Sequence, residues 1–284
     1  QLLASEGFET VEEIAYVAPE DFITIEGFDE DVAAELQERA REFAAGSSKA
    51  DVAQGITLNP IDRTIADDGS VSYELVEVAL DRAARRATIT IKGPEEDAPA
   101  DMDAFTAQGD QAYMLRLARE FDDAILHLRL NEKELGLMVF KTQGDPEAFA
   151  AHEQLLLDNA EHWLANEVLQ YWKRLLKRID MTSRSLVALI ENGSCFAGVL
   201  AEILFAVDRS YMMEGDFEGD NRPVATITLT DGNFGPFPMG NGLTRLETRF
   251  IGETEKNLEA KERIGEALEA FDVEELGLVT FAYD

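Results

Sequence analysis

The stretch SLVALIENGSCFAGVLAEILFAVDRSY, residues 185–211, decides the fold of this chain. It opens with a short apolar run, residues 186–190, which is typical of a buried strand. A turn follows at Glu191-Asn192-Gly193, and small residues lead into residues 199–207, which are apolar nearly all round. We therefore expect a buried strand, a tight turn and a buried helix in succession.

One carboxylate, Glu202, lies in the middle of the predicted helix. Burial disfavours the charged form of a carboxyl group, so the group must be neutral, paired with a cation or used in chemistry. Small residues before the helix would let a substrate approach backbone N–H groups at its N-terminus, where negative charge is stabilised. The stretch predicts either an oxyanion site beside an acid/base group or a structural pair of Glu202 with Arg209 or Arg245.

The composition limits the possible classes of protein. The chain has 284 residues, a hydrophobic content of 45% and a formal net charge of −32. Such a charge argues against nucleic-acid binding, because phosphates would be repelled. Cys195 is the single cysteine, which excludes an internal disulfide and favours a reducing, cytoplasmic location. No apolar run reaches 18 residues, so we expect no membrane-spanning helix.

Residues 1–46 differ from the rest of the chain. They contain thirteen Asp or Glu and two Arg, which gives a net charge of −11. The turn signals SEGF and IEGF recur 20 residues apart, and each precedes a helical pattern. We predict a small all-α helix-hairpin-helix module with Gly7 and Gly27 in the tight turns, followed by a linker at residues 47–58.

The segments SEGFETVEEIAYV and IEGFDEDVAAELQERA resemble the acidic C-terminal repeats of the transcription factor NusA. That resemblance implies a protein-docking role, for example on a polymerase subunit. Where nucleic-acid-binding hairpins usually have a second glycine, this chain has Glu9 and Asp29, whose carboxylates would repel phosphate. The alternative is a small packing domain that precedes the main one.

Residues 59–284 show strands alternating with helices. This alternation predicts an α/β fold with buried, largely parallel strands. Residues 93–110 are predicted to be a polar loop. The strands are expected at residues 71–78, 86–92, 135–141, 185–190, 208–213 and 224–230. The helices are expected at residues 112–130, 146–179 (as one or two helices), 199–207, 243–250 and 258–269.

Four segments carry a second resemblance: ITLNPIDRTIADDGSVSY, AREFDDAILHLRLNEKELGLMVFKTQGD, SRSLVALIENGSCFAGVLAEILFAVDRSYM and NFGPFPMGNGLTRLETRF. They resemble the crotonase (enoyl-CoA hydratase/isomerase) superfamily and, within it, the C-terminal half of the benzoyl-CoA-dihydrodiol lyases. The resemblance implies a spiral of strand-strand-helix units over residues 59–284. It also implies a lyase that cleaves the ring of 2,3-epoxybenzoyl-CoA in aerobic benzoate degradation, with a coenzyme A thioester as substrate and no metal or redox cofactor.

The resemblance also suggests roles for individual residues. Glu202 matches the acid/base residue of the family, and Asp231 matches the second acid, which is usually a glutamate. Gly198 and Ala197 lie near the oxyanion-binding glycine, but the usual Gly-Gly-Gly is Ala-Gly-Val here. The turn at residues 141–145, where the first oxyanion donor is expected, lacks the family pattern.

Other candidate residues have weaker support. Cys195 could be a nucleophile, contact the substrate or act as a small apolar filler. The basic residues Lys173, Arg174 and Lys177 could bind the phosphates of coenzyme A, or they could complement a helix dipole. The three histidines lack metal-ligand spacing, so no metal site is predicted.

Two functions therefore compete for the main domain. In the first, Glu202 and Asp231 form the acid/base pair of a working acyl-CoA enzyme. In the second, the domain is a degenerate repeat that supports a missing N-terminal catalytic half or associates with other copies of itself. We favour the second. The alternative from another class is a binding module of a transcription elongation or termination factor, acting through residues 1–46.

Overall fold

The computed structural model describes residues 33–34, 36–41, 55–215 and 219–283. The chain divides into two compact units, Gln1–Gly55 and Ile56–Asp284. In the first unit the described residues 33–34 and 36–41 are helical. The predicted hairpin turns, the NusA-like segments and most of the predicted linker lie outside the described residues, so the domain limits at residues 46 and 58 stay predictions.

The second unit is built on an eight-stranded sheet with the order β1-β2-β3-β4-β5-β6-β8-β11. Neighbouring strands from β1 to β4 are antiparallel, whereas β4, β5, β6, β8 and β11 are parallel. The strands are β1 (Thr64–Ile65), β2 (Val71–Ser72), β3 (Val76–Asp81), β4 (Arg86–Lys92), β5 (Leu137–Gln143), β6 (Ser185–Ile190), β8 (Arg209–Met213) and β11 (Phe281–Tyr283).

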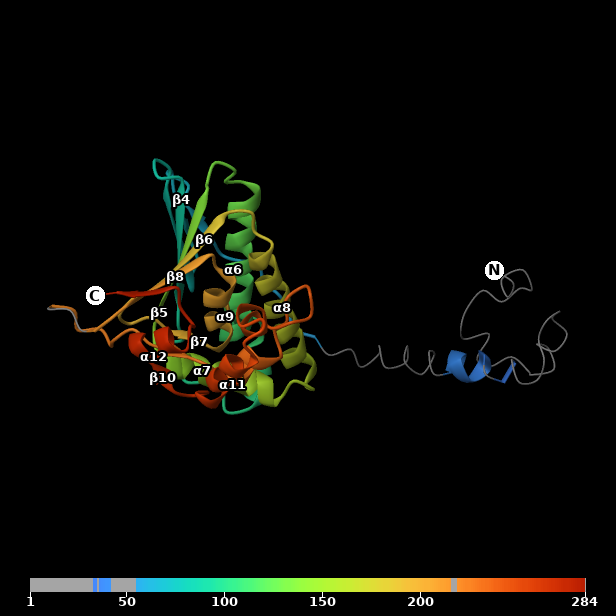
Figure 1. Ribbon diagram of the computed structural model, residues 1–284. Coiled ribbons are helices and arrows are strands. Elements are labelled where there is room, and N and C mark those ends of the chain that lie inside the picture. Colours follow the sequence, from blue (N-terminus) through green and yellow to red (C-terminus); the bar gives the residue numbers. More distant parts are fainter. Residues whose placement is uncertain (1–32, 35, 42–54, 216–218, 284) are drawn as a thin grey trace. The chain divides into compact units, whose positions relative to one another are not determined.

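Helices cover one face of this sheet, as Figure 1 shows for α6, α8 and α9. Alternate strand residues, such as Ile89 and Ile91 of β4, point into this layer and are completely buried. The indole of Trp172 donates a hydrogen bond to the backbone oxygen of Met114 at 3.1 Å, which joins two of the helices. These helices are α6 (Tyr113–Leu130), α7 (Pro146–Asp158), α8 (Trp163–Asp180) and α9 (Gly198–Ala206).

A small second sheet lies beside the turn that leads into α9. It contains β7 (Phe196–Ala197), β9 (Ile227–Thr228) and β10 (Ala267–Leu268). β7 pairs with β9 in parallel, and β9 pairs with β10 antiparallel. The remaining helical segments are α5 (Met102–Ala107), η2 (Gly109–Gln111), η3 (Asp231–Phe234), α10 (Arg245–Arg249), α11 (Thr254–Glu262) and α12 (Ala270–Glu275).

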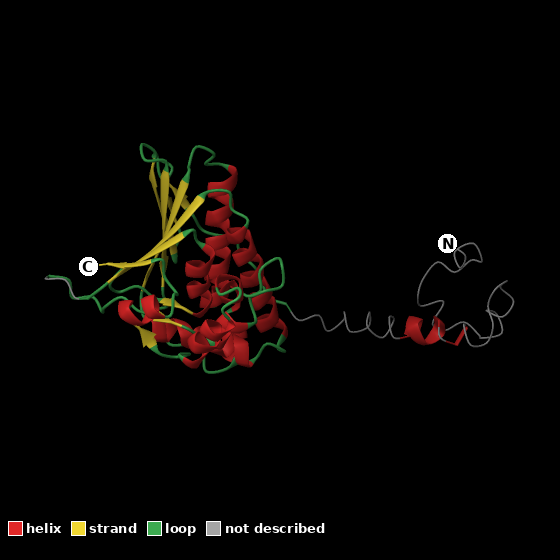
Figure 2. Cartoon of the chain, in the orientation of Figure 1, coloured by secondary structure: helices red, strands yellow, loops and turns green. Residues whose placement is uncertain are grey.

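The α/β prediction is confirmed, and Figure 2 shows the layered arrangement of strands and helices. The predicted succession at residues 185–211 is also present: strand β6, a turn, the short strand β7 and helix α9. No helix in the described part of the chain is long and apolar enough to cross a membrane.

Four local predictions were wrong. The single strand expected at residues 71–78 is a hairpin, in which β2 pairs antiparallel with β3. Residues 93–110 are not a continuous loop, because Asp101 caps α5 by accepting a hydrogen bond from the Ala104 backbone N–H at 2.8 Å. The strand expected at residues 224–230 is limited to the two residues of β9, because Thr230 is the N-cap of η3. The helix expected at residues 258–269 ends at Glu262, and its last residues form β10.

Candidate functional site

The predicted acid/base residue Glu202 lies on α9, one of the most buried helices of the second unit. Residues 198–205 are all buried, and Glu202 is 1% exposed. The helix is apolar because it packs against α7, α8, α10 and η3. A carboxyl group in this position has no contact with bulk water and depends on protein partners.

Both carboxylate oxygens of Glu202 have such partners. Oε2 accepts a hydrogen bond from Nη1 of Arg245 at 2.9 Å, and Oε1 accepts one from Nδ2 of Asn233 at 2.7 Å. Arg245, itself 1% exposed, also forms a bidentate pair with Asp180 at 3.0 and 2.7 Å. The pair of Glu202 with Arg245 is thus the structural alternative that the sequence left open.

Burial raises the pKa of Glu202 to about 7, and Arg245 and Asn233 oppose this shift. The chemistry of the partners favours the charged form, because the guanidinium and the amide nitrogen only donate. Protonation of Glu202 would give up its ion pair with Arg245. Glu202 is therefore arranged as the anionic member of a buried ion pair.

A second buried carboxyl group, Glu153 of α7, contacts the N-terminus of α9. It is 0% exposed, and its Oε1 accepts a hydrogen bond from the Val199 backbone N–H at 2.7 Å. Its Oε2 accepts one from the hydroxyl of Thr230 at 2.6 Å. Glu153 therefore occupies the helix N-terminus at which negative charge on a substrate was predicted to be stabilised.

Two glycines make room for this carboxyl group. A Cβ atom on Gly198, whose φ is +46°, would lie 1.9 Å from Oε2 of Glu153. A Cβ atom on Gly232 would lie 2.8 Å from Oε1. Larger side chains at these positions would collide with the carboxylate, so Gly198 serves to admit Glu153.

Sequence reasoning missed Glu153. It is 46 residues from Val199 and 77 residues from Thr230 along the chain, so no local spacing links them. The available signal was its spacing from Phe149 and Leu156, which places Glu153 on the buried face of the helix, although a glutamate is normally exposed. Burial raises the pKa of Glu153 to about 7, and the charges of Glu202 and Asp231 add to this effect.

The second predicted acid, Asp231, is the first residue of η3 and is exposed. Among the hydrogen bonds and ion pairs of the described residues, none joins Asp231 to Glu202. Its neighbour Asn233 makes that contact instead and also donates to the backbone oxygen of Gly198 at 2.9 Å. The structure thus brings η3 to Glu202 through an amide rather than through the predicted second carboxylate.

Cys195 and Ala197 are completely buried beside the ends of the strands. The Cys195 backbone N–H donates to the hydroxyl of Thr142 at 2.8 Å, and its sulfur lies against Gly93 and Gly144. Burial raises the pKa of the Cys195 thiol to about 11, so the nucleophilic thiolate is scarce at neutral pH. These contacts agree with the role of a small filler.

The turn at residues 141–145 was the predicted place of the first oxyanion donor. The Gly144 backbone N–H donates to the backbone oxygen of Gly193 at 3.0 Å. Asp145 caps α7 by accepting a hydrogen bond from the Glu147 backbone N–H at 2.8 Å. Both groups are therefore engaged within the protein.

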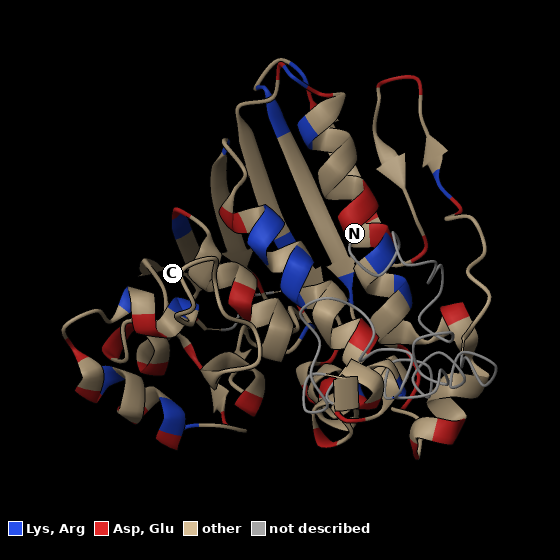
Figure 3. Ribbon diagram, turned by 90° about the vertical axis from the view of Figure 1, so that its right-hand side faces the viewer, with Lys and Arg blue, Asp and Glu red and all other residues tan. Residues whose placement is uncertain are grey.

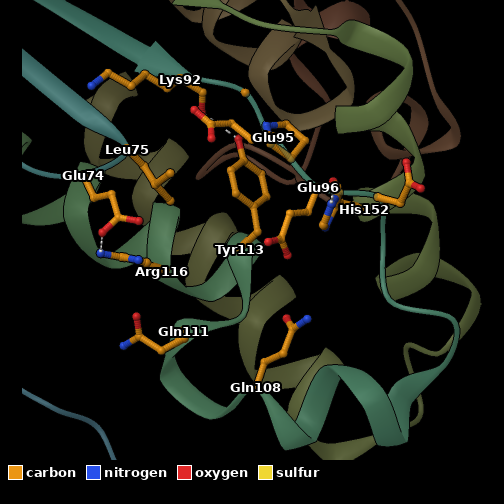
Figure 4. A pocket seen from close by; sticks show the side chains of 13 residues that line it. Glu74, Leu75, Lys92, Glu95, Glu96, Gln108, Gln111, Tyr113, Arg116 and His152 are labelled. Atoms are coloured by element: carbon orange, nitrogen blue, oxygen red, sulfur yellow. Dashed lines mark hydrogen bonds and ion pairs between the residues drawn. The ribbon is translucent and has the colours of Figure 1, made fainter.

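A cavity of about 380 Å³ lies where β4 ends and is shown in Figure 4. None of the predicted site residues lines it. Its charged lining residues include four acids and two cations, both of which are paired with acids. An acidic lining disfavours the phosphates of coenzyme A. The lining residues are Glu74, Leu75, Lys92, Gly93, Pro94, Glu95, Glu96, Asp97, Gln108, Gln111, Tyr113, Arg116 and His152.

The predicted phosphate-binding residues Lys173, Arg174 and Lys177 lie on α8. The guanidinium of Arg174 packs over the ring of Tyr171 at 5.3 Å from its centroid. Figure 3 shows Lys and Arg interspersed with Asp and Glu over the helical face. Within the described ranges, no group of three or more His, Cys, Asp or Glu residues could hold a metal ion.

No family model matches the chain, but comparison with known proteins finds a sequence relative. The chain is 39% identical over 245 residues to benzoyl-CoA-dihydrodiol lyase from Aromatoleum evansii. The match covers 86% of this chain but 43% of the relative, so the chain spans less than half of that protein's length.

Solved structures with a similar arrangement are more distant in sequence. They include an enoyl-CoA hydratase from Geobacillus kaustophilus, with 16% identity, a TM-score of 0.47 and coverage of 75% of this chain and 70% of that one. Human mitochondrial delta3-delta2-enoyl-CoA isomerase has 15% identity, a TM-score of 0.48 and coverage of 74% and 71%.

Proposed function

We propose that this chain, a crotonase-type relative of benzoyl-CoA-dihydrodiol lyase, serves as a supporting domain of such a lyase and does not carry its acid/base chemistry. The relationship rests on the 39% identity over 245 residues. The relative is more than twice as long as the matched part, which leaves room for a separate catalytic half. The residues that the resemblance marked as catalytic decide whether this domain is a supporting domain or a working acyl-CoA enzyme.

The state of Glu202 carries this proposal. A general acid or base must reach the proton that it transfers, directly or through one water molecule. Glu202 is 1% exposed, and both of its oxygens accept hydrogen bonds from Arg245 and Asn233. A carboxylate held in this way links α9 to α10 and η3, and its burial keeps its oxygens away from a substrate at the surface.

The groups around Glu202 support the same conclusion. The Val199 N–H at the start of α9 is bonded to Glu153, and the Gly144 N–H is bonded to Gly193. An oxyanion site needs donors that are free to face the developing charge. The N–H groups of Val199, at the start of α9, and of Gly144, in the turn at residues 141–145, already have acceptors within the chain.

The complete enzyme would act on an aromatic acyl-CoA. On the resemblance, it would cleave the ring of 2,3-epoxybenzoyl-CoA without a metal or redox cofactor, and the coenzyme A thioester would be its substrate. The acidic cavity beside β4 is a poor match for the phosphates of that substrate, so the acyl-CoA site would lie in the partner half. Association with that half or with further copies follows from the proposal, and a docking role for residues 1–46 stays an alternative.

The test combines this chain with the part of the Aromatoleum evansii lyase that lies outside the match. Each piece is purified, and lyase turnover is measured alone and after mixing or co-expression. The proposal expects no turnover from this chain alone, and turnover when the two pieces are combined. Turnover by this chain alone, lost in Glu202→Gln while the variant stays folded, would overturn the proposal.

A further inference from the structure

Glu153 is a fully buried carboxyl group whose charge no cation neutralises. Among the ion pairs of the described residues, none includes Glu153, whereas Glu202 has Arg245. The charged groups that act on it are Glu202 from α9 and Asp231 from η3, and both are acids. Arg245 of α10 is engaged by Glu202 and Asp180. Ionisation of Glu153 would therefore place a third negative charge among acids without a compensating cation.

The hydrogen bonds of Glu153 allow it to keep a proton. Its Oε2 lies 2.6 Å from the hydroxyl of Thr230, and a hydroxyl can donate or accept. The same hydroxyl oxygen accepts from the Gly232 backbone N–H at 3.1 Å and also from the Asn233 backbone N–H in the capping box of η3. Neither partner of Glu153 is a cation, and both can donate to the oxygens of a neutral acid as well as to those of a carboxylate. Glu202 differs, because the guanidinium of Arg245 favours its charged form.

We propose that Glu153 is a proton-dependent lock that holds α7, the first turn of α9 and η3 together. With its proton, the carboxyl group satisfies the Val199 N–H and the Thr230 hydroxyl without burying a charge. Without the proton, the same group is an uncompensated buried anion beside two acids, and opening this contact to water relieves the cost. This role of Glu153 concerns the internal structure of the domain, so the proposal does not depend on whether the chain is catalytic.

The direction of the pH dependence follows from how tightly the folded and unfolded states bind the proton of Glu153. The pKa of Glu153 is raised to about 7 in the folded chain, above the ordinary value of a glutamate. The folded state therefore binds the proton more tightly than the unfolded state does. The stabilisation is complete at acidic pH and is lost as the pH rises through about 7. The lock loosens just above neutral pH.

The test compares wild type with Glu153→Gln, because an amide keeps the shape of the protonated acid and does not titrate. The matched control is Glu147→Gln on the exposed first turn of α7. Thermal unfolding and hydrogen exchange of the Val199 and Gly232 amides are followed from about pH 5 to about pH 8. The surface groups titrate in all three proteins, so the difference between them reports on Glu153 and on its interaction with Glu202.

The proposal expects the melting temperature of wild type and of Glu147→Gln to fall by several degrees more than that of Glu153→Gln over this range. Exchange of the Val199 amide should speed up in wild type toward pH 8, beyond the intrinsic effect of pH, and much less in Glu153→Gln. If the melting temperature and the Val199 amide exchange depended equally on pH in wild type and Glu153→Gln, the proposal for Glu153 would be overturned.

A second measurement, on the wild-type protein, does not require Glu153→Gln to fold. Infrared spectra of wild type should show the carbonyl stretch of a protonated carboxylic acid near pH 6, weakening toward pH 8. The band should persist in Glu202→Gln, which separates the two buried acids. Absence of the band at about pH 6 would contradict a protonated Glu153.

Discussion

Glu202 and Arg245 form an ion pair with 2.9 Å between Oε2 and Nη1, and each side chain is 1% exposed. Asp180 holds the other edge of the same guanidinium at 2.7 Å. The pair joins α9 to α10, and Asp180 adds the end of α8. A residue that sequence resemblance marks as an acid/base group is therefore the anionic centre of a buried cluster that ties three helices together.

Removal of the cation should destabilise the domain strongly. Arg245→Met leaves Glu202 and Asp180 buried without a counter-charge, which costs about 3–5 kcal/mol when a buried pair is broken. Urea unfolding at neutral pH measures the loss, and Arg209→Met, at an exposed position, serves as the control. A loss of less than about 1 kcal/mol, similar to that of the control, would show that the cluster is not held by Arg245.

Gly198→Ala should destabilise the chain beyond the cost of backbone strain. The new Cβ atom would lie 1.9 Å from Oε2 of Glu153, and φ at this position is +46°. Gly215→Ala is a matched control, because Gly215 also has a positive φ, of +81°, but nothing lies within 4 Å of its Cβ position. The control should lose about 1 kcal/mol.

The difference between these two alanine variants measures the collision with Glu153. We expect Gly198→Ala to unfold at a clearly lower urea concentration than Gly215→Ala. Equal midpoints for the two variants would mean that the carboxyl group moves aside without cost, and the close packing around Glu153 would then have no energetic role.

The thiol of Cys195 should react slowly in the folded protein. It is completely buried and its pKa is raised to about 11, so the thiolate is a minor species at neutral pH. Labelling with a chromogenic disulfide at neutral pH should be slow and should become fast in denaturant. Rapid labelling of the folded chain would indicate an accessible, activated thiol and would revive its role in substrate contact.

The sequence predicted the elements whose signals are local. The apolar run at residues 186–190 and the apolar segment after it became β6 and α9, because burial on all sides leaves an uninterrupted apolar pattern. The possible pairing of Glu202 with Arg245 was also open from the sequence, since a buried carboxylate needs a cation. The choice between Arg209 and Arg245 depended on the tertiary structure.

Features that depend on contacts between distant parts of the chain could not be predicted from the sequence. Glu153 lies 46 residues before Val199, so no local signal predicts their contact, although its spacing from Phe149 and Leu156 places it on the buried face of α7. β11 pairs in parallel with β8, so that Phe281 lies beside Tyr211 across 70 residues of chain. The capping of α5 by Asp101 was a local signal, but the Asp- and Pro-rich composition of residues 93–110 concealed it.

The central claim is that Glu202 has a structural role in this chain. Calorimetric titration with benzoyl-CoA, for wild type and Glu202→Gln, tests it most directly. We expect no heat above the dilution blank for either protein, together with a lower unfolding midpoint for the variant. Micromolar binding to wild type that weakens or disappears in a folded Glu202→Gln variant would contradict the claim and would place a working acyl-CoA site at Glu202.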